Sequence, residues 1–362
     1  MTSSSTPTRL LVTGAAGFIG TNFVRWVLGR GDEAGTSSVR RLVALDLLTY
    51  AGNYANLADC EADPRFRFVR GDIAARDAVA ALVAEERIDG IVHFAAETHV
   101  DRSIGDHAPF LRTNVEGTLA LLEAVRGRSD FRCFLHVSTD EVYGSIAEGR
   151  AAEDWPSHPS SPYAASKAAA DGFVQAYALT HGVPAVVTRC SNNYGPYQFP
   201  EKLIPLFVTN ALDGEPLPLY GDGMNVRDWI HVEDHVAALG HVLGLGARDG
   251  RVYNVSAENE VPNRSVTDRI LELLSRPASL VRYVKDRPGH DRRYALDSSR
   301  LRATGWRPRR DFVEGLAATV AWYRDNRSWW EAVKSGAYRD YYERMYGGRL
   351  RAAGDRPREP GT

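Results

Sequence analysis

The chain has 362 residues, of which 44% are hydrophobic and 25% charged, and its net charge is −2 at pH 7. This balance is typical of a globular enzyme and argues against nucleic acid or an anionic membrane as the main partner. No stretch approaches about 18 consecutive apolar residues, the length of a membrane-spanning helix, and the three cysteines form no CxxC pair. We therefore expect a cytoplasmic protein without a membrane segment.

Apolar runs alternate with helix-length segments over the first half of the chain. Strands are expected at 10–13, 42–46, 66–70, 90–95, 131–137 and 185–188, and helices at 18–28, 75–86, 109–125 and 163–180. Nearly continuous apolar strands separated by helices predict a parallel sheet covered on both faces. This is the doubly wound, Rossmann-type α/β fold, whose ligands bind beyond the carboxyl ends of the strands.

Prolines and glycines cluster after residue 192, and the alternation becomes irregular. Helices are still expected at 231–243 and 266–274, and over the aromatic segment 312–346. We expect a nucleotide-cofactor domain at 9–191 and a smaller, mixed α/β lobe at 192–346, partly interwoven with it. The ends of the chain, 1–8 and 347–362, are expected to be disordered tails.

A glycine turn follows the first predicted strand, in the run Leu10-Leu-Val-Thr-Gly14-Ala-Ala-Gly17-Phe-Ile-Gly20. Gly14 allows a tight turn, Gly17 lets the backbone approach a pyrophosphate, and Gly20 permits close packing of the helix. Asp46 ends the second strand, where a carboxylate accepts hydrogen bonds from ribose hydroxyls and repels a 2′-phosphate. It favours NAD over NADP, although a helix-capping aspartate is the alternative interpretation.

Two further segments lie at the same edge of the predicted sheet. Asp72 and Ile73 follow the third strand, and the run Ala95-Ala96-Glu97-Thr98 follows the fourth. We expect the first pair to contact adenine and the second run to contact the nicotinamide ribose.

Acid-base residues follow the fifth predicted strand. Tyr163 and Lys167 share a face of a predicted helix, and a nearby ammonium group and nicotinamide ring would lower the pKa of the tyrosine toward neutrality. Asp140 and Glu141 reach one substrate only if the chain turns between them. In a partly dry cleft two carboxyls should titrate apart, which suits one acid and one base. The alternative is a solvated pair that caps a turn.

With these motifs the chain resembles the dTDP-glucose 4,6-dehydratases of the extended short-chain dehydrogenase/reductase superfamily. The resemblance runs from Leu10 to about Tyr346. It rests on Thr49-Tyr-Ala-Gly-Asn53, Glu97-Thr-His-Val-Asp-Arg-Ser103, Ser138 to Gly144, Tyr163-Ala-Ala-Ser-Lys167, Cys190-Ser-Asn-Asn-Tyr-Gly-Pro196, Phe199-Pro-Glu-Lys-Leu-Ile-Pro205, Arg227-Asp-Trp229, Val232-Glu-Asp-His235 and Asp286-Arg-Pro-Gly-His-Asp-Arg-Arg-Tyr294.

The resemblance implies that dTDP-glucose is dehydrated to a 4-keto-6-deoxy sugar nucleotide with tightly bound NAD and no metal. Tyr163 would take the proton of the 4-hydroxyl as hydride leaves C4, with Lys167 beside it. Glu141 would then remove the C5 proton while Asp140 protonates the departing 6-hydroxyl, and the hydride returns to C6. Thr139 would polarise the 4-ketone. Many relatives have serine where Ala164 stands, a position without a catalytic step.

The resemblance also implies two sets of contacts. Cofactor contacts are expected from Gly14, Gly17, Phe18, Ile19, Gly20, Asp46, Leu47, Thr49, Asp72, Ile73, Ala95, Ala96, Thr98, Thr113, Tyr163, Lys167 and Asn193. Substrate contacts are expected from Glu97, Thr98, Thr139, Asn192, Lys202, Leu203, Pro218, Tyr220, Arg227, Asn263, Arg287, His290 and Tyr294. Among these, Arg227 is expected to clamp a phosphate.

Three alternatives remain open at this point. A nucleotide-sugar 4-epimerase would use the same glycine turn, tyrosine and lysine, but has no task for Asp140 and Glu141. A 4,6-dehydratase could act on another sugar nucleotide, such as UDP-glucose, and a non-catalytic NAD-binding sensor could share the fold. The predicted helices at 109–125 and 163–180 resemble those through which family members pair, so a homodimer is expected.

Overall fold

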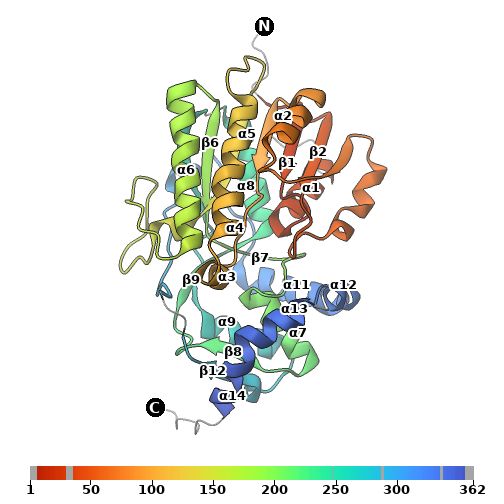
Figure 1. Ribbon diagram of the computed structural model, residues 1–362. Helices are drawn as coiled ribbons and strands as arrows, with labels where there is room; N and C mark the ends of the chain where they lie inside the picture. Colours follow the sequence, from red (N-terminus) through yellow and green to blue (C-terminus); the bar gives the residue numbers. More distant parts are fainter. Residues whose placement is uncertain (1–5, 30–35, 247, 287–288, 335–336, 355–362) are drawn as a thin grey trace.

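The central sheet of the computed structural model has seven parallel strands in the order β10-β6-β5-β4-β1-β2-β3 (Figure 1). The structure describes residues 6–29, 36–246, 248–286, 289–334 and 337–354. The strands of this sheet are β1 (Arg9–Thr13), β2 (Arg41–Asp46), β3 (Phe66–Arg70), β4 (Gly90–His93), β5 (Cys133–Thr139), β6 (Ala185–Cys190) and β10 (Asp249–Val255).

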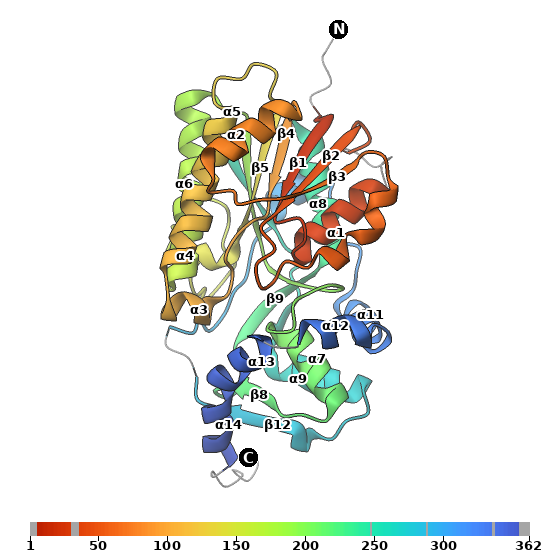
Figure 2. The same ribbon diagram turned by 45° about the vertical axis from the view of Figure 1, so that its right-hand side comes forward.

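Helices cover both faces of this sheet, which explains why its strands are apolar on both sides. Leu10 and Val12 of β1 pack toward one face, which is covered by α1 (Phe18–Gly29) and α8 (Val232–Leu245). Leu11 packs toward the other face, which is covered by α2 (Arg76–Glu85), α5 (Thr118–Val125) and α6 (Pro162–His181) (Figure 2). The predicted doubly wound fold is confirmed.

The strand order indicates where a ligand crevice lies in the large sheet. β1 pairs with β2 on one side and with β4 on the other, so the winding of the chain reverses between β1 and β4. In such sheets ligands bind in the crevice outside the carboxyl ends at this reversal. The glycine turn, Asp46 and the segments after β4 and β5 all lie at this edge.

A second lobe lies below the carboxyl ends of the strands (Figure 1). It holds a three-stranded sheet, β11-β9-β7, and a parallel pair, β12-β8. Its strands are β7 (Asn192–Tyr194), β8 (Leu217–Tyr220), β9 (Val226–His231), β11 (Glu260–Pro262) and β12 (Val281–Val284). Its helices are α7 (Leu203–Asp213), α9 (Asn263–Leu273), α11 (Phe312–Asp325), α12 (Arg327–Val333), α13 (Ala337–Tyr342) and α14 (Gly348–Gly354).

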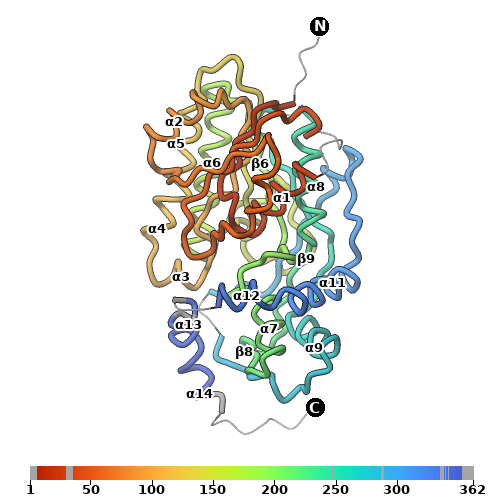
Figure 3. Tube along the Cα trace, turned by 90° about the vertical axis from the view of Figure 1, so that its right-hand side faces the viewer, coloured from red at the N-terminus to blue at the C-terminus, as the bar shows by residue number. Residues whose placement is uncertain are grey.

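The two parts of the chain are interwoven. After β9 the chain returns to the first domain, where α8 covers the sheet and β10 adds the outermost strand beside β6. It then enters the second lobe again at β11. Aromatic helices α11 and α12 lie between the first domain and α7 and α9 (Figure 3). There the indole N–H of Trp329 donates to Asn56 Oδ1 of the first domain at 2.7 Å.

Several elements differ from their predicted bounds. The predicted helix 109–125 consists of α4 (Ala108–Phe110), a π-helical turn (Leu111–Gly117) and α5, and α3 (Val100–Gly105) precedes it. The aromatic segment 312–346 is divided into separate helices by a break at Asn326. α7 was not predicted. Its Pro205 is compatible with the helix because it stands in the first turn, where no intrahelical N–H is needed. The other short elements are α10 (Ser299–Ala303), a second π-helical turn (Glu343–Gly347) and the 3₁₀ turns Tyr54–Asn56, Ala58–Ala62, Asp140–Tyr143 and Ala278–Leu280.

Described residues within both predicted tails make ordered contacts. The backbone N–H and the hydroxyl of Thr8 donate to the carboxylate of Asp89, so the chain is already fixed before β1 begins. At the other end, residues 348–354 form α14 instead of a tail. Within the described parts of the chain, the helices are all too short or too polar to cross a membrane.

Candidate active site

Two adjoining cavities lie between the carboxyl edge of the large sheet and the second lobe. The first has a volume of about 300 Å³ and the second of about 160 Å³. The first is lined by residues that follow the strands of the large sheet, and the second mainly by residues of the second lobe. Both are lined by Glu141, Asn192, Asn193, Gln198, Glu201 and Lys202.

The glycine turn at the first cavity requires glycine at two of its positions. Gly14 has a φ of 67°, and a Cβ added there would lie 2.6 Å from the backbone nitrogen of Ala95, which follows β4. A Cβ at Gly20 would lie 2.1 Å from the carbonyl oxygen of Gly14. The turn is therefore packed too closely for a side chain at either position, and the N–H groups of Gly14, Ala16 and Gly17 already donate within the protein. The N–H groups that suit an anion are those of the first turn of α1, which begins at Phe18.

Asp46 links this turn to the end of β2. One carboxylate oxygen accepts the N–H of Ala16 at 2.9 Å, and the other accepts the N–H of Leu48 at 2.7 Å. Burial raises the pKa of Asp46, and these two hydrogen bonds oppose the rise. Asp46 thus shapes the turn and also lines the first cavity, where its predicted task is to accept ribose hydroxyls.

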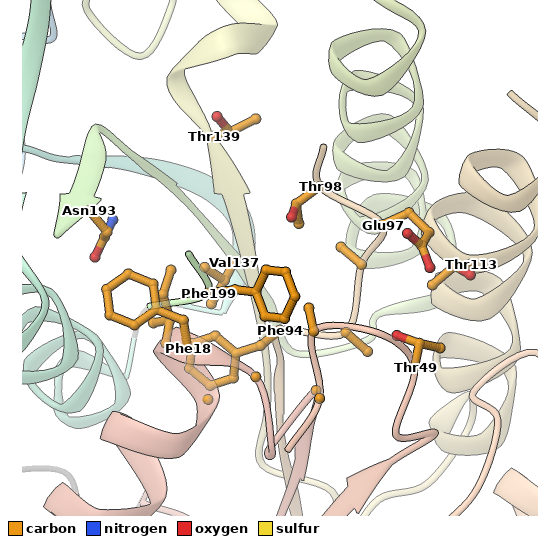
Figure 4. Close-up of a pocket in the computed structure, with 18 of the residues that line it drawn as sticks. Phe18, Thr49, Phe94, Glu97, Thr98, Thr113, Val137, Thr139, Asn193 and Phe199 are labelled. Carbon is orange, nitrogen blue, oxygen red and sulfur yellow. The ribbon is translucent and has the colours of Figure 1, made fainter. Parts of the chain in front are cut away.

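Figure 4 shows aromatic and polar side chains on opposite sides of the first cavity. On one side lie Phe18, Phe94 and Phe199, and across the pocket from them lie Thr49, Glu97 and Thr113.

Some polar groups that line this cavity lack a hydrogen-bond partner. Among the described residues, Ser138 Oγ, Ser191 Oγ and Asn192 Oδ1 are buried without a hydrogen-bond partner. Buried polar atoms are rarely left unpaired, so these atoms indicate a polar ligand.

Tyr163 and Lys167 both line the first cavity and are almost completely buried. Burial, followed by the nearby Glu141, raises the pKa of Tyr163 well above its ordinary value. The lowering of this pKa expected from the sequence therefore depends on positive charge placed beside the phenol. Burial lowers the pKa of Lys167 to about 8, so the lysine still carries most of its charge at neutral pH.

Lys167 is held by groups from the strands beneath it. Its ammonium donates to the carbonyl of Val137 at 2.8 Å and lies 3.4 Å from His136 Nε2. The same histidine nitrogen lies 3.4 Å from Asp171, which accepts a hydrogen bond from Arg189 at 2.9 Å. Burial lowers the pKa of His136 to about 4, so the imidazole stays neutral beside the lysine.

The chain turns directly after β5, at Asp140 and Glu141, as both side chains need in order to reach one substrate. Thr139 ends β5, and its hydroxyl accepts the backbone N–H of Glu141 at 3.2 Å, which caps the 3₁₀ turn Asp140–Tyr143. Both carboxyl residues consequently line the first cavity, and Glu141 also lines the second. The solvated alternative is wrong for Asp140, which is 4% exposed.

The surroundings of Asp140 favour the protonated form of its carboxyl group. Burial, followed by the charges of Glu141 and Asp228, raises its pKa well above the ordinary value. Its Oδ1 accepts the hydroxyl of Thr139 at 3.1 Å, and its Oδ2 has no hydrogen-bond partner among the described residues. A protonated carboxyl that lines a cavity can donate its proton to a leaving oxygen.

The second cavity carries the cations and rings expected for a nucleotide. The guanidinium of Arg227 lies 4.4 Å from the ring centre of Tyr294, and it donates to the carbonyls of Val226 and Asp291. His290 packs edge-on against Tyr220, with ring centres 5.9 Å apart. These contacts hold a planar cation in place before any ligand arrives.

The structure brings the predicted residues together almost without exception. All 17 predicted cofactor residues line the first cavity, as do Glu97, Thr98 and Thr139 of the substrate set. Asn192 and Lys202 line both cavities. The second cavity is lined by Leu203, Pro218, Tyr220, Arg227, Asn263, His290 and Tyr294, whereas Arg287 lies outside the described residues.

Some lining residues were missed. Gly71, Phe94 and Ser191 follow strands β3, β4 and β6, and Cys190 ends β6, so the rule that identified Asp72 would have found them. Others do not follow a strand of the large sheet: Gln198, Phe199, Glu201, Ile204, Phe207, Trp229 and Tyr346. Of these, Phe199, Glu201, Ile204 and Trp229 stand in the motifs quoted for the resemblance, which could have indicated them.

Comparison with known proteins places this chain in a family. Residues 11–319 match the family described as GDP-mannose 4,6 dehydratase. A dTDP-glucose 4,6-dehydratase from Actinoplanes sp. is 54% identical over 323 residues, which are 89% of this chain and 99% of that protein. The crystal structure of a dTDP-glucose 4,6-dehydratase from Streptomyces venezuelae, with NAD and TYD bound, has a TM-score of 0.85 and 52% identity. It covers 90% of this chain and 100% of its own.

Related structures include another activity. A UDP-glucose 4-epimerase from Thermus thermophilus, in complex with NAD, has a TM-score of 0.79 and 34% identity. It covers 88% of this chain and 99% of its own. The fold alone therefore does not separate dehydration from epimerisation, and the residues of the site have to do so.

Proposed function

Because this chain belongs to the GDP-mannose 4,6-dehydratase family, we propose that it is an NAD-dependent lyase that converts dTDP-D-glucose to dTDP-4-keto-6-deoxy-D-glucose. The relatives that support this substrate are named dTDP-glucose 4,6-dehydratase and match nearly the whole chain. The epimerase alternative is not favoured, since the epimerase structure is less similar. The proposed location is the cytoplasm.

The first cavity fits NAD. The glycine turn, Asp46 and the unsatisfied Ser138, Ser191 and Asn192 suit a pyrophosphate, a ribose and further polar groups of a dinucleotide. Bound NAD would supply the oxidising chemistry, as the acceptor of the hydride from C4 and the donor of the same hydride to C6. The chain contributes the site that holds it and the groups that move protons.

We assign the proton transfers to three side chains. Tyr163, beside the charged Lys167, removes the proton of the 4-hydroxyl. Once C4 is a ketone, the C5 proton is acidic. We assign its removal to Glu141, which lines both cavities. Asp140, whose pKa burial raises well above its ordinary value, donates its proton to the departing 6-hydroxyl, and water leaves across C5 and C6. When C6 receives the hydride, C5 takes a proton back, which completes the 4-keto-6-deoxy sugar.

The observation that carries this proposal is the placement of Asp140 and Glu141 on one capped turn at the junction of the two cavities. An epimerase breaks no C6–O6 bond and has no task for a second acid. A site with one acid and one base beside an oxidising cofactor can eliminate water.

Product mass tests the reaction directly. The purified chain should turn dTDP-glucose into a product lighter by one water, and UDP-glucose should react far more slowly. A product of unchanged mass would indicate epimerisation and overturn the proposal. A faster reaction with UDP-glucose would overturn the assigned nucleotide only.

The role of Glu141 is tested by Glu141→Gln. This variant should still oxidise C4, seen as absorbance of reduced nicotinamide, while water loss falls by roughly 10²–10⁴. Tyr163→Phe should block both events, which separates the first proton transfer from the second. Normal product release by Glu141→Gln would remove Glu141 from the mechanism.

We also propose a homodimer. Exposed apolar side chains lie on helical segments that contact one another: Ile104 and Leu111 before α5, and Phe173 and Leu179 on α6. Leu179 is 87% exposed, so a second copy would remove substantial apolar surface from water. Sedimentation should give a dimer at micromolar concentration, and Leu179→Glu should shift it toward monomer. A wild-type monomer would contradict this.

A further inference from the structure

Three segments that border the cofactor cavity meet at one buried carboxylate, Glu201. The hydroxyl of Tyr50 donates to its Oε1 at 3.1 Å, and the guanidinium of Arg102 donates to its Oε2 at 3.3 Å. The same guanidinium lies 3.8 Å from the ring centre of Tyr50. The three side chains therefore contact one another in a closed triangle, which we call the clasp.

Each member of the clasp comes from a different wall of the first cavity. Tyr50 stands between Thr49 and Ala51, which both line the cavity after β2. Arg102 belongs to α3, just after the lining residue Thr98, and Glu201 itself lines the cavity from the second lobe. A ligand in the first cavity is thus surrounded by loops that the clasp joins.

Further contacts hold the same loops. The ammonium of Lys202 donates to the carbonyl of Thr98 at 3.0 Å, which makes a second link between the two lobes. Phe199 packs edge-on against Tyr50, with ring centres 5.5 Å apart. From behind, the hydroxyl of Tyr338 donates to the carbonyl of Pro200 at 2.8 Å.

The charges make the clasp cooperative. The side chain of Glu201 is 3% exposed, and burial raises its pKa while Lys202 and Arg102 oppose the rise. A buried carboxylate that loses its partners is strongly unfavourable. Parting the loops therefore requires all contacts of Glu201 to break together, so opening is a discrete event.

We propose that Tyr50, Arg102 and Glu201 form a clasp that closes over the bound dinucleotide and sets the rate at which NAD leaves the chain. The proposal rests on the proposed function only in taking NAD as the ligand of the first cavity. It explains how a cofactor that is reduced and reoxidised within one turnover is retained between the two hydride transfers.

NAD exchange tests the clasp without any sugar nucleotide. The holoenzyme is mixed with excess etheno-NAD, and replacement of bound NAD is followed by fluorescence. Glu201→Gln, which removes the charge, should release NAD at least tenfold faster than wild type. Tyr50→Phe, which removes only the hydroxyl, should accelerate release about threefold. Added NAD should restore the occupancy of both variants.

The matched control is Glu331→Gln on α12, which breaks an exposed ion pair with Arg327 away from both cavities. It should release NAD at the wild-type rate. Thermal melting by circular dichroism establishes that each variant is folded, and Tyr50→Phe decides the matter if Glu201→Gln does not fold. Wild-type exchange rates in the folded clasp variants would overturn the proposal, whatever reaction the wild type catalyses.

Discussion

Asp140 couples the stability of the fold to pH through a single buried proton. Its pKa in the folded chain lies well above that of an exposed aspartate, because of burial first and of Glu141 and Asp228 second. An aspartate in an unfolded chain titrates near pH 3.9. Above about pH 4 the unfolded chain loses this proton while the folded chain keeps it, so the folded state loses relative stability as pH rises.

Asp140→Asn removes this proton uptake. The Tm of Asp140→Asn relative to wild type should therefore increase as pH rises from about 5 toward the raised pKa of Asp140, as measured by circular dichroism. Asp222→Asn is the control. The Arg292 guanidinium lowers the pKa of Asp222 to about 2, so this carboxyl is ionised in both states over that range. Its Tm difference should stay constant, and a constant difference for Asp140→Asn would contradict the buried proton.

For single residues, the sequence predicted the reacting side chains but not the neighbouring residues that hold them in place. Asp140, Glu141, Tyr163 and Lys167 stand in motifs with recognisable spacing. The partners His136 and Asp171 do not, because they are ordinary polar residues of a strand and a helix until packing places them near Lys167. The pKa of such a group depends on these neighbours and cannot be derived from spacing.

Among the elements, α1 and α8 pack against each other through one glycine. A Cβ added at Gly240 of α8 would lie 2.1 Å from the ring of Trp26 on α1. Gly240→Ala should therefore lower the free energy of unfolding by about 1–3 kcal/mol, as overpacking does. Urea titration measures this value, and an unchanged free energy would show that α8 can shift without cost.

Gly172 on α6 provides the opposite case. An added Cβ there meets nothing within 4 Å, and alanine is a better helix former than glycine. Gly172→Ala should raise the free energy of unfolding by roughly 0.5–1 kcal/mol. A loss of stability would show that the exposed face of α6 has no room for the methyl group.

Elements with an uninterrupted apolar pattern were predicted well, and those defined by tertiary contacts were not. The strands of the large sheet were found up to β6, whereas β10 was missed because Asp249 to Val255 interrupts its apolar residues with a glycine and an arginine. The π-helical turn at Leu111–Gly117 was also missed. There the side chain of Asn114 is bonded to the backbone of Glu97, a contact that no local pattern reveals.

For the whole molecule, interweaving predicts one cooperative unfolding transition. The second lobe cannot unfold alone, because the chain that leaves it forms α8 and β10 of the first domain. Tryptophans are buried in both parts, Trp26 and Trp306 in the core of the first domain and Trp229 and Trp330 in the second lobe, and helices of both parts contribute to circular dichroism. Fluorescence and circular dichroism should therefore give the same urea midpoint, and two separated midpoints would contradict this.

The position of β10 also has a consequence for synthesis on the ribosome. Strand β6 ends at Cys190, but its outer neighbour is complete only at Val255. At a translation rate of about 5–20 residues per second, the outer edge of β6 stays unpaired for several seconds until β10 has been synthesised. Such an edge invites pairing with other nascent chains. Fast translation of this interval should favour correct folding, and rare codons placed between β6 and β10 should increase inclusion bodies.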